Sequence, residues 1–174
     1  MSSLSGERAT ILRILAEQRD LLLITVRGIG DEEATQRTTV SDLTLAGIVK
    51  HLTACERTWA HIVTERDGNP PGWPGSEEQY RMGEGETLAS LVADYTAAAR
   101  ETEEAVATLT DLDRVIQLPA APWWPEPPAW SIRFILLHLL RETAHHCGHA
   151  DIIREALDGA NTTRSMTGEA SITT

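Results

Sequence analysis

Residues 131–159 read SIRFILLHLLRETAHHCGHADIIREALDG, and this stretch predicts one long helix. Ser131 is placed to cap its start, and Gly159 is a natural end. At about 100° per residue, a narrow arc of this helix carries a mixed set of side chains: Ile135, His138, Glu142, His146, His149 and Ile153, with His145 at the edge. Polar groups therefore interrupt the core-facing stripe, and buried polar groups need partners.

A first helix is expected over about residues 5–27, where apolar side chains recur every three or four positions. These inward residues are Ile11, Leu12, Leu15, Leu22 and Val26. The charged side chains between them are expected to face water: Glu7, Arg13, Glu17 and Arg19. Gly28 and Gly30 end the helix, and the polar run that follows, residues 31–39, is typical of a surface connection.

A second helix is expected from near Thr44 to about Glu65, with Ser41, Asp42 or Thr44 as its cap. Its inward face contains a histidine among apolar residues: Ile48, His51, Cys55, Trp59 and Ile62. A third helix is expected over about residues 87–110, whose apolar positions again follow helical spacing.

Two segments rich in proline, residues 67–85 and 118–128, interrupt the helical pattern. The first, which is also rich in glycine, is expected to be a long loop without regular elements. Four helical stretches and no convincing strand pattern predict an all-α four-helix bundle over residues 1–159. Residues 160–174 show no periodicity and are expected to form a flexible tail.

Composition narrows the classes of function. The chain of 174 residues is about one domain long, and it has no apolar run of membrane-spanning length and no secretory signal, so a cytoplasmic protein is expected. Cys55 and Cys147 are too few for a disulfide framework. The net charge of −11, with Lys and Arg scattered along the chain, makes nucleic acid an unfavourable partner.

The polar arc of the fourth helix suggests a metal site. Glu142 and His146 are four residues apart, so both side chains can point at one divalent ion, and His51 is the natural third donor. A single buried histidine is more often hydrogen-bonded than metal-bound, but four of the six histidines fall between residues 138 and 149. His138 and His149 are possible additional ligands. His145 and His149 have the same spacing as Glu142 and His146 and could replace that pair.

Two strings resemble DinB/YfiT-like proteins: GIVKHL at residues 47–52, with Glu56 and Trp59, and the fourth-helix string from Ser131 to Asp151. The resemblance spans about residues 7–159. It implies a four-helix bundle that binds a divalent metal, most often zinc or nickel, through one histidine of the second helix and two ligands of the fourth. His51, Glu142 and His146 stand at those places. The carboxylate at 142, where many members have histidine, is also similar to mycothiol-dependent maleylpyruvate isomerase.

The resemblance also implies a reaction. Such proteins use the metal to activate a low-molecular-weight thiol, such as mycothiol or bacillithiol, for transfer to an electrophilic substrate or for isomerisation, and a homodimer is expected. Metal binding lowers a thiol's pKa, and the thiolate is the reactive form. The alternative is a noncatalytic metal-binding or stress-related bundle, in which the ion only ties two helices together. A closed, fully protein-ligated shell without an adjacent cavity would favour that alternative.

Several other side chains have two interpretations. Trp73, Trp123, Trp124 and Trp130 lie in or beside the proline-rich segments, where they either line the mouth of a pocket or pack a loop onto the bundle. Cys55, one turn after His51, either approaches the metal or is a small buried apolar residue, and the second interpretation is favoured.

Overall fold

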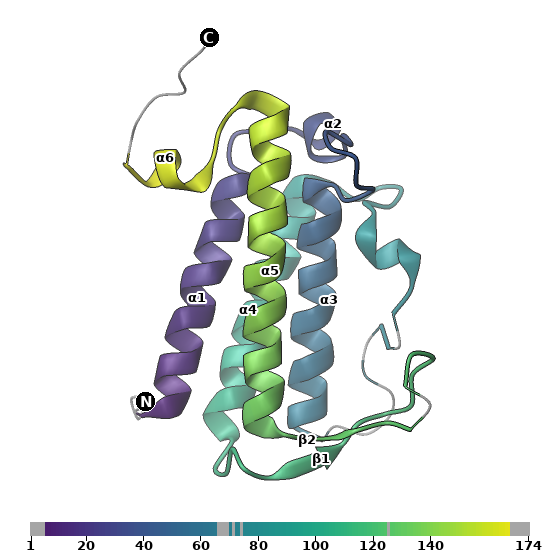
Figure 1. Ribbon diagram of the computed structural model, residues 1–174, viewed down its shortest axis with the longest axis vertical. Coiled ribbons are helices and arrows are strands. Elements are labelled where there is room, and N and C mark those ends of the chain that lie inside the picture. The colour runs from purple at the N-terminus through teal and green to yellow at the C-terminus, as the bar shows by residue number, and fades with distance from the viewer. Residues whose placement is uncertain (1–5, 66–69, 71, 74, 125, 168–174) are drawn as a thin grey trace.

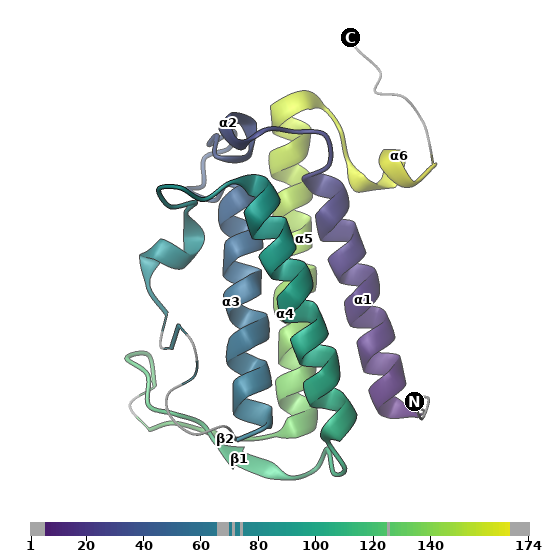
Figure 2. The same cartoon turned by 180° about the vertical axis from the view of Figure 1, so that it is seen from behind.

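The computed structural model describes residues 6–65, 70, 72–73, 75–124 and 126–167. Its four long helices are α1 (Glu7–Thr25), α3 (Leu45–Val63), α4 (Leu88–Thr108) and α5 (Ile132–Asp158). α3 packs against both α4 and α5, and α1 packs against α5. Figures 1 and 2 show α5 on one face of the bundle and α4 on the opposite face. The predicted all-α bundle is confirmed.

The helix ends follow local signals in the sequence. The side chains of Thr44, Thr87 and Ser131 each accept a hydrogen bond from a backbone N–H in the first turn of α3, α4 and α5. Thr44 is therefore the cap among the three candidates. Gly159 ends α5 with a φ of 77°, in the left-handed region where glycine has no steric penalty.

A layer of polar residues divides the apolar core into two parts, one around Leu15, Trp59 and Leu139 and the other around Leu22, Leu52 and Ala150. Each long helix contributes one buried residue to this layer: Arg19, Glu56, Thr102 and Thr143. The expectation that Arg19 faces water is wrong. Its side chain turns inward because Glu56 offers a buried carboxylate as a partner.

The shorter elements lie between the long helices. α2 (Asp31–Ala34) falls in the first connection, and the 3-10 helix η1 (Glu77–Tyr80) falls in the segment expected to be loop, which corrects that expectation. β1 (Val115–Gln117) pairs antiparallel with β2 (Ala129–Ser131) on either side of the second proline-rich segment. The expectation of no strands missed this pair, because three residues are too few to establish alternation.

The end of the chain contains α6 (Thr162–Thr167), which contacts α1. Residues 168–174 of the expected tail lie outside the described residues, as do residues 66–69, 71 and 74 of the expected loop. The division at residue 159 stays a prediction. None of the helices in the described part of the chain is both long and apolar enough to cross a membrane.

Candidate metal centre and its pocket

His51 from α3 meets Glu142 and His146 from α5 where the two helices pack. One nitrogen or oxygen atom of each side chain lies within 4.8 Å of the corresponding atoms of the other two. The rings of His51 and His146 are in edge contact, with centroids 4.8 Å apart and planes at 69°. The structure thus brings together the three residues that the sequence singled out.

The protonation of the two histidines suits metal binding. Burial lowers the pKa of His51, against the opposing effects of Gln79 and Glu142. Burial also lowers the pKa of His146 to about 4, with smaller contributions from His51, His149 and His145. Both rings are therefore neutral near pH 7 and have a free electron pair for an ion.

The donor set fits a divalent transition metal. Two neutral imidazoles and one carboxylate are ligands that zinc and similar ions accept. Bonds of about 2.0–2.2 Å place neighbouring ligand atoms of a tetrahedral site roughly 3.4 Å apart. Atoms within 4.8 Å of one another reach this spacing by small side-chain rotations.

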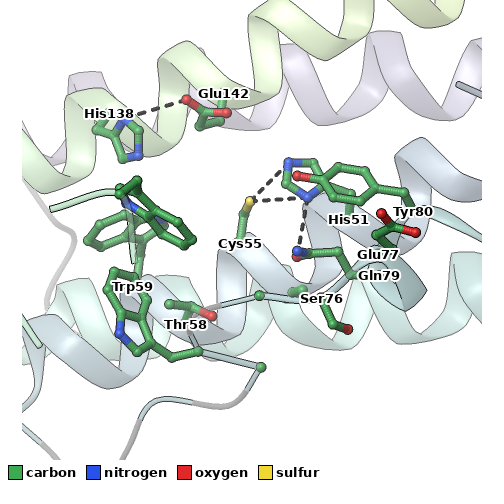
Figure 3. Close-up of a pocket in the computed structure, with 15 residues that line it drawn as sticks. His51, Cys55, Thr58, Trp59, Ser76, Glu77, Gln79, Tyr80, His138 and Glu142 are labelled. Atoms are coloured by element: carbon green, nitrogen blue, oxygen red, sulfur yellow. Dashed lines mark hydrogen bonds and ion pairs between the residues drawn. The ribbon is translucent and has the colours of Figure 1, made fainter. Parts of the chain in front are cut away.

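His51 is held by residues of its own helix and of η1, as Figure 3 shows. The Tyr80 ring stacks on the imidazole at 4.5 Å, and Gln79 Oε1 lies 3.4 Å from Nδ1. When Nδ1–H donates to Gln79, the electron pair is on Nε2. Cys55 Sγ lies 3.5 Å from Nε2. Burial, with the nearby charges of Glu142 and Glu56, raises the pKa of Cys55 to about 12, so this cysteine is a thiol rather than a thiolate.

The remaining histidines of α5 surround the cluster. His138 Nδ1 lies 3.6 Å from Glu142 Oε1 and 2.6 Å from a guanidinium nitrogen of Arg141. His149 Nδ1 lies 3.4 Å from His146 Nδ1, whereas His145 is exposed and contacts the His149 ring. Among the described residues, His51, Glu142 and His146 form the group with metal-ligand geometry. Among these residues, the alternative pair of His145 and His149 does not form a ligand group with His51.

The polar arc of α5 lies beside the core rather than in it. The buried side of the helix includes the two apolar ends of the arc, Ile135 and Ile153, but otherwise consists of other residues: Ile132, Leu136, Leu139, Thr143, Cys147, Ala150 and Arg154. His138, Glu142, His146 and His149 are half-buried next to it. The expectation of a core-facing polar stripe is corrected, because a pocket takes the place of packed side chains there.

The pocket is a cavity of about 440 Å³ between α3, α5 and the two proline-rich segments. Its polar end is lined by His51, Cys55, Gln79, Tyr80 and Glu142, and its aromatic end by Trp59, Trp73, Trp123 and His138. Neither lysine nor arginine is among the described residues that line it. Two of the candidate ligands, His51 and Glu142, therefore border a space that can hold a small molecule.

Both interpretations of the loop tryptophans hold in part. Trp73 and Trp123 line the pocket, while Trp124 and Trp130 pack against the apolar core. No sequence signal identifies Gln79 and Tyr80 as neighbours of His51, because they lie in a segment without periodicity. His138 as an additional ligand stays a prediction, and its ring packs edge-on against Trp59 at 4.9 Å.

Comparisons with known proteins agree with this architecture. The sequence matches the mycothiol S-transferase family over residues 10–159. A crystal structure described as a conserved protein from Enterococcus faecalis superposes with a TM-score of 0.70 at 13% identity, covering 90% of this chain and 100% of the other. At this identity the likeness concerns the fold. A search of curated proteins found no match.

Proposed function

Since this chain belongs to the mycothiol S-transferase family, we propose that it joins the sulfur of a low-molecular-weight thiol to an electrophilic substrate, with the help of a divalent ion. His51, Glu142 and His146 are the proposed ligands, zinc or nickel the proposed ion, and mycothiol the proposed thiol. The observation that carries this proposal is that two of the three proposed ligands, His51 and Glu142, line a cavity of about 440 Å³, with His146 beside them.

The chain's own residues prepare the site for such a reaction. A bound divalent ion would supply the positive charge that favours the thiolate form of the substrate. Gln79 and Tyr80 fix the orientation of the His51 ring, and Arg141 and His138 contact the Glu142 carboxylate. Burial raises the pKa of Cys55 in the metal-free protein, and the reactive sulfur of this proposal is that of the substrate thiol.

The cavity is also what separates the transferase from a noncatalytic bundle. An ion that only ties α3 to α5 needs a complete shell of protein ligands and no space for a substrate. Here the described residues offer three ligands, which leaves coordination positions for a thiol on the pocket side. This favours the transferase.

The test is thiol consumption. Purified protein with one equivalent of zinc or nickel is mixed with mycothiol and either chloroacetamide or 4-nitrobenzyl chloride, and the remaining thiol is titrated. We expect conjugation above the uncatalysed rate, its loss in His146→Ala and its retention in His145→Ala. Failure to accelerate either reaction with either ion would favour the noncatalytic alternative.

Two further expectations accompany the proposal. Both cysteines of the chain are free thiols, which agrees with a reducing, cytoplasmic compartment. A homodimer is proposed from the family resemblance alone, and light scattering of the purified protein would test it.

A further inference from the structure

We propose that the substrate joined to the thiol is a neutral, flat aromatic electrophile, and that it binds against an indole wall formed by Trp59, Trp73 and Trp123. The conjugation of this substrate to the thiol rests on the proposed function. The binding itself needs neither thiol nor ion and can be measured separately.

The wall is a continuous aromatic surface. The Trp59 and Trp73 rings meet edge-to-face at 6.1 Å and 77°, and Trp73 meets Trp123 at 5.8 Å and 62°. Trp130 stacks on Trp59 at 5.6 Å, which holds the Trp59 ring in place. Edge-to-face and offset contacts are the arrangements that aromatic rings prefer, so a further flat ring can extend this series.

The indole N–H of Trp73 already has a hydrogen-bond partner within the protein. Its Nε1–H donates to the carbonyl of Ala120 at 2.7 Å, which joins the two proline-rich segments. The part of the ring that remains for a ligand is therefore apolar. Trp123 is 54% exposed, a high value for so large an apolar side chain. A ligand ring placed against it would cover surface that the protein leaves in contact with water.

Charge selects against an anionic substrate. The charged side chains that line the cavity are Glu77 and Glu142, and no lysine or arginine is among its described lining residues. In the metal-free protein both carboxylates therefore repel a carboxylate or phosphate. A neutral ring meets no such penalty.

The indole wall is next to the candidate ligands. His138 contacts both Trp59 and Glu142, and Figure 3 shows these three side chains close together in the pocket. A benzylic carbon on a ring at the wall thus faces the polar end. There the thiolate sulfur forms a bond to this carbon, the carbon–halogen bond breaks, the halide leaves with the electron pair, and the thiol proton passes to solvent.

Binding is tested on the metal-free protein with three unreactive probes of matched shape. These are methyl 4-(hydroxymethyl)benzoate, the corresponding carboxylate, and the saturated ester methyl 4-(hydroxymethyl)cyclohexanecarboxylate. Isothermal titration should show binding of the aromatic ester, with the carboxylate and the saturated ester at least about fivefold weaker. Equal affinities for the three probes, or no binding of the aromatic ester, would overturn the proposal.

Two variants locate the site. Trp123→Leu removes an exposed ring from the wall and should weaken binding of the aromatic ester about fivefold. Trp124→Leu removes the neighbouring ring, which does not line the cavity, and should leave affinity within about twofold. Melting temperatures establish that both variants are folded. An equal loss in the two variants, or no loss in Trp123→Leu, would contradict the assigned wall.

The binding test for the aromatic substrate and the conjugation test for the transferase can fail independently of each other. If the aromatic ester binds but no thioether forms from any electrophile, the substrate site stands and the transferase fails. If chloroacetamide is conjugated but the aromatic ester does not bind, the transferase stands and the aromatic substrate class is wrong.

Discussion

The guanidinium of Arg19 donates two hydrogen bonds to the Glu56 carboxylate inside the bundle, Nε to Oε1 at 2.7 Å and Nη2 to Oε2 at 2.9 Å. Thr102 donates a third bond to the same carboxylate. Glu56 is 0% exposed and Arg19 5%. The two charges depend on each other, because a buried ion without its partner keeps its full desolvation cost.

Arg19→Met should therefore lower the free energy of unfolding by about 3–5 kcal/mol, measured by chemical denaturation. Arg13→Met is the matched control in the same helix, since Arg13 pairs with Glu17 at 4.0 Å on the surface, and it should cost less than about 1 kcal/mol. The double variant Arg19→Met with Glu56→Leu should recover much of the loss. Equal effects of the two arginine variants would show that the buried pair is not coupled.

This pair also shows where prediction from the sequence stops. The periodicity of α1 is a property of one helix, and it placed Arg19 among the charged residues facing water. Its partner Glu56 is 37 residues away, and only the assembly of the bundle, in which α1 and α3 both pack against α5, brings them together. The helix ends were predictable because Thr44, Ser131 and Gly159 act within one turn.

The candidate ligands were predictable for a similar reason. Glu142 and His146 are one helical turn apart, and His51 stood out as a histidine on the apolar inward face of its helix. The surroundings of His51 were not predictable. Gln79 and Tyr80 come from η1, and their position depends on contact with α3 rather than on any local pattern.

The three candidate ligands predict that the folded protein binds a metal ion. Purified protein should bind about one divalent ion per chain, and chelation should lower its melting temperature, because an ion that binds only the folded state stabilises it. His51→Ala and His146→Ala should each weaken zinc binding by at least about 100-fold, measured by elemental analysis and titration. If both variants keep the metal content and affinity of the unchanged protein, the ligand assignment is wrong.

The choice between Glu142 and the neighbouring histidines can be made by isothermal titration with zinc. Glu142→Ala should reduce affinity strongly, while His145→Ala should have little effect because its side chain is exposed. His149→Ala should have an intermediate effect, since its ring lies beside His146. Loss of binding in His145→Ala and His149→Ala, with Glu142→Ala unaffected, would move the site to the other pair.

The lowered pKa of His146 predicts the acid response of the metal-free protein. An unfolded histidine titrates near pH 6.5, whereas burial and the neighbouring imidazoles bring the pKa of His146 to about 4. Between these values the unfolded chain binds a proton that the folded chain does not, so stability falls as the pH falls through this window. The measurement is made with a chelator present, so that no metal is bound. Between pH 7 and pH 5 the urea midpoint of the unchanged protein should fall more than that of His146→Gln. An equal fall of the urea midpoint in the two proteins would contradict the lowered pKa of His146.

Gly47 lies in the first turn of α3, directly against the backbone of η1. A methyl group at this position would overlap the carbonyl oxygen of Tyr80, which is backbone and cannot rotate away. The Tyr80 ring stacks on His51, and Gln79 lies within 3.4 Å of His51 Nδ1. Gly47→Ala must therefore push η1 off α3, and both contacts that orient the imidazole move with it.

Gly47→Ala should thus weaken zinc binding about tenfold and lower the melting temperature, although it removes no ligand. Gly148→Ala is the matched control, because an added methyl group there meets nothing within 4 Å although the residue lies between His146 and His149 in α5. It should stabilise the protein by about 0.5–1 kcal/mol, since alanine favours helix, and leave zinc affinity unchanged. Isothermal titration and chemical denaturation of both variants make the comparison. If Gly47→Ala lowers stability but binds zinc like the unchanged protein, η1 does not orient His51.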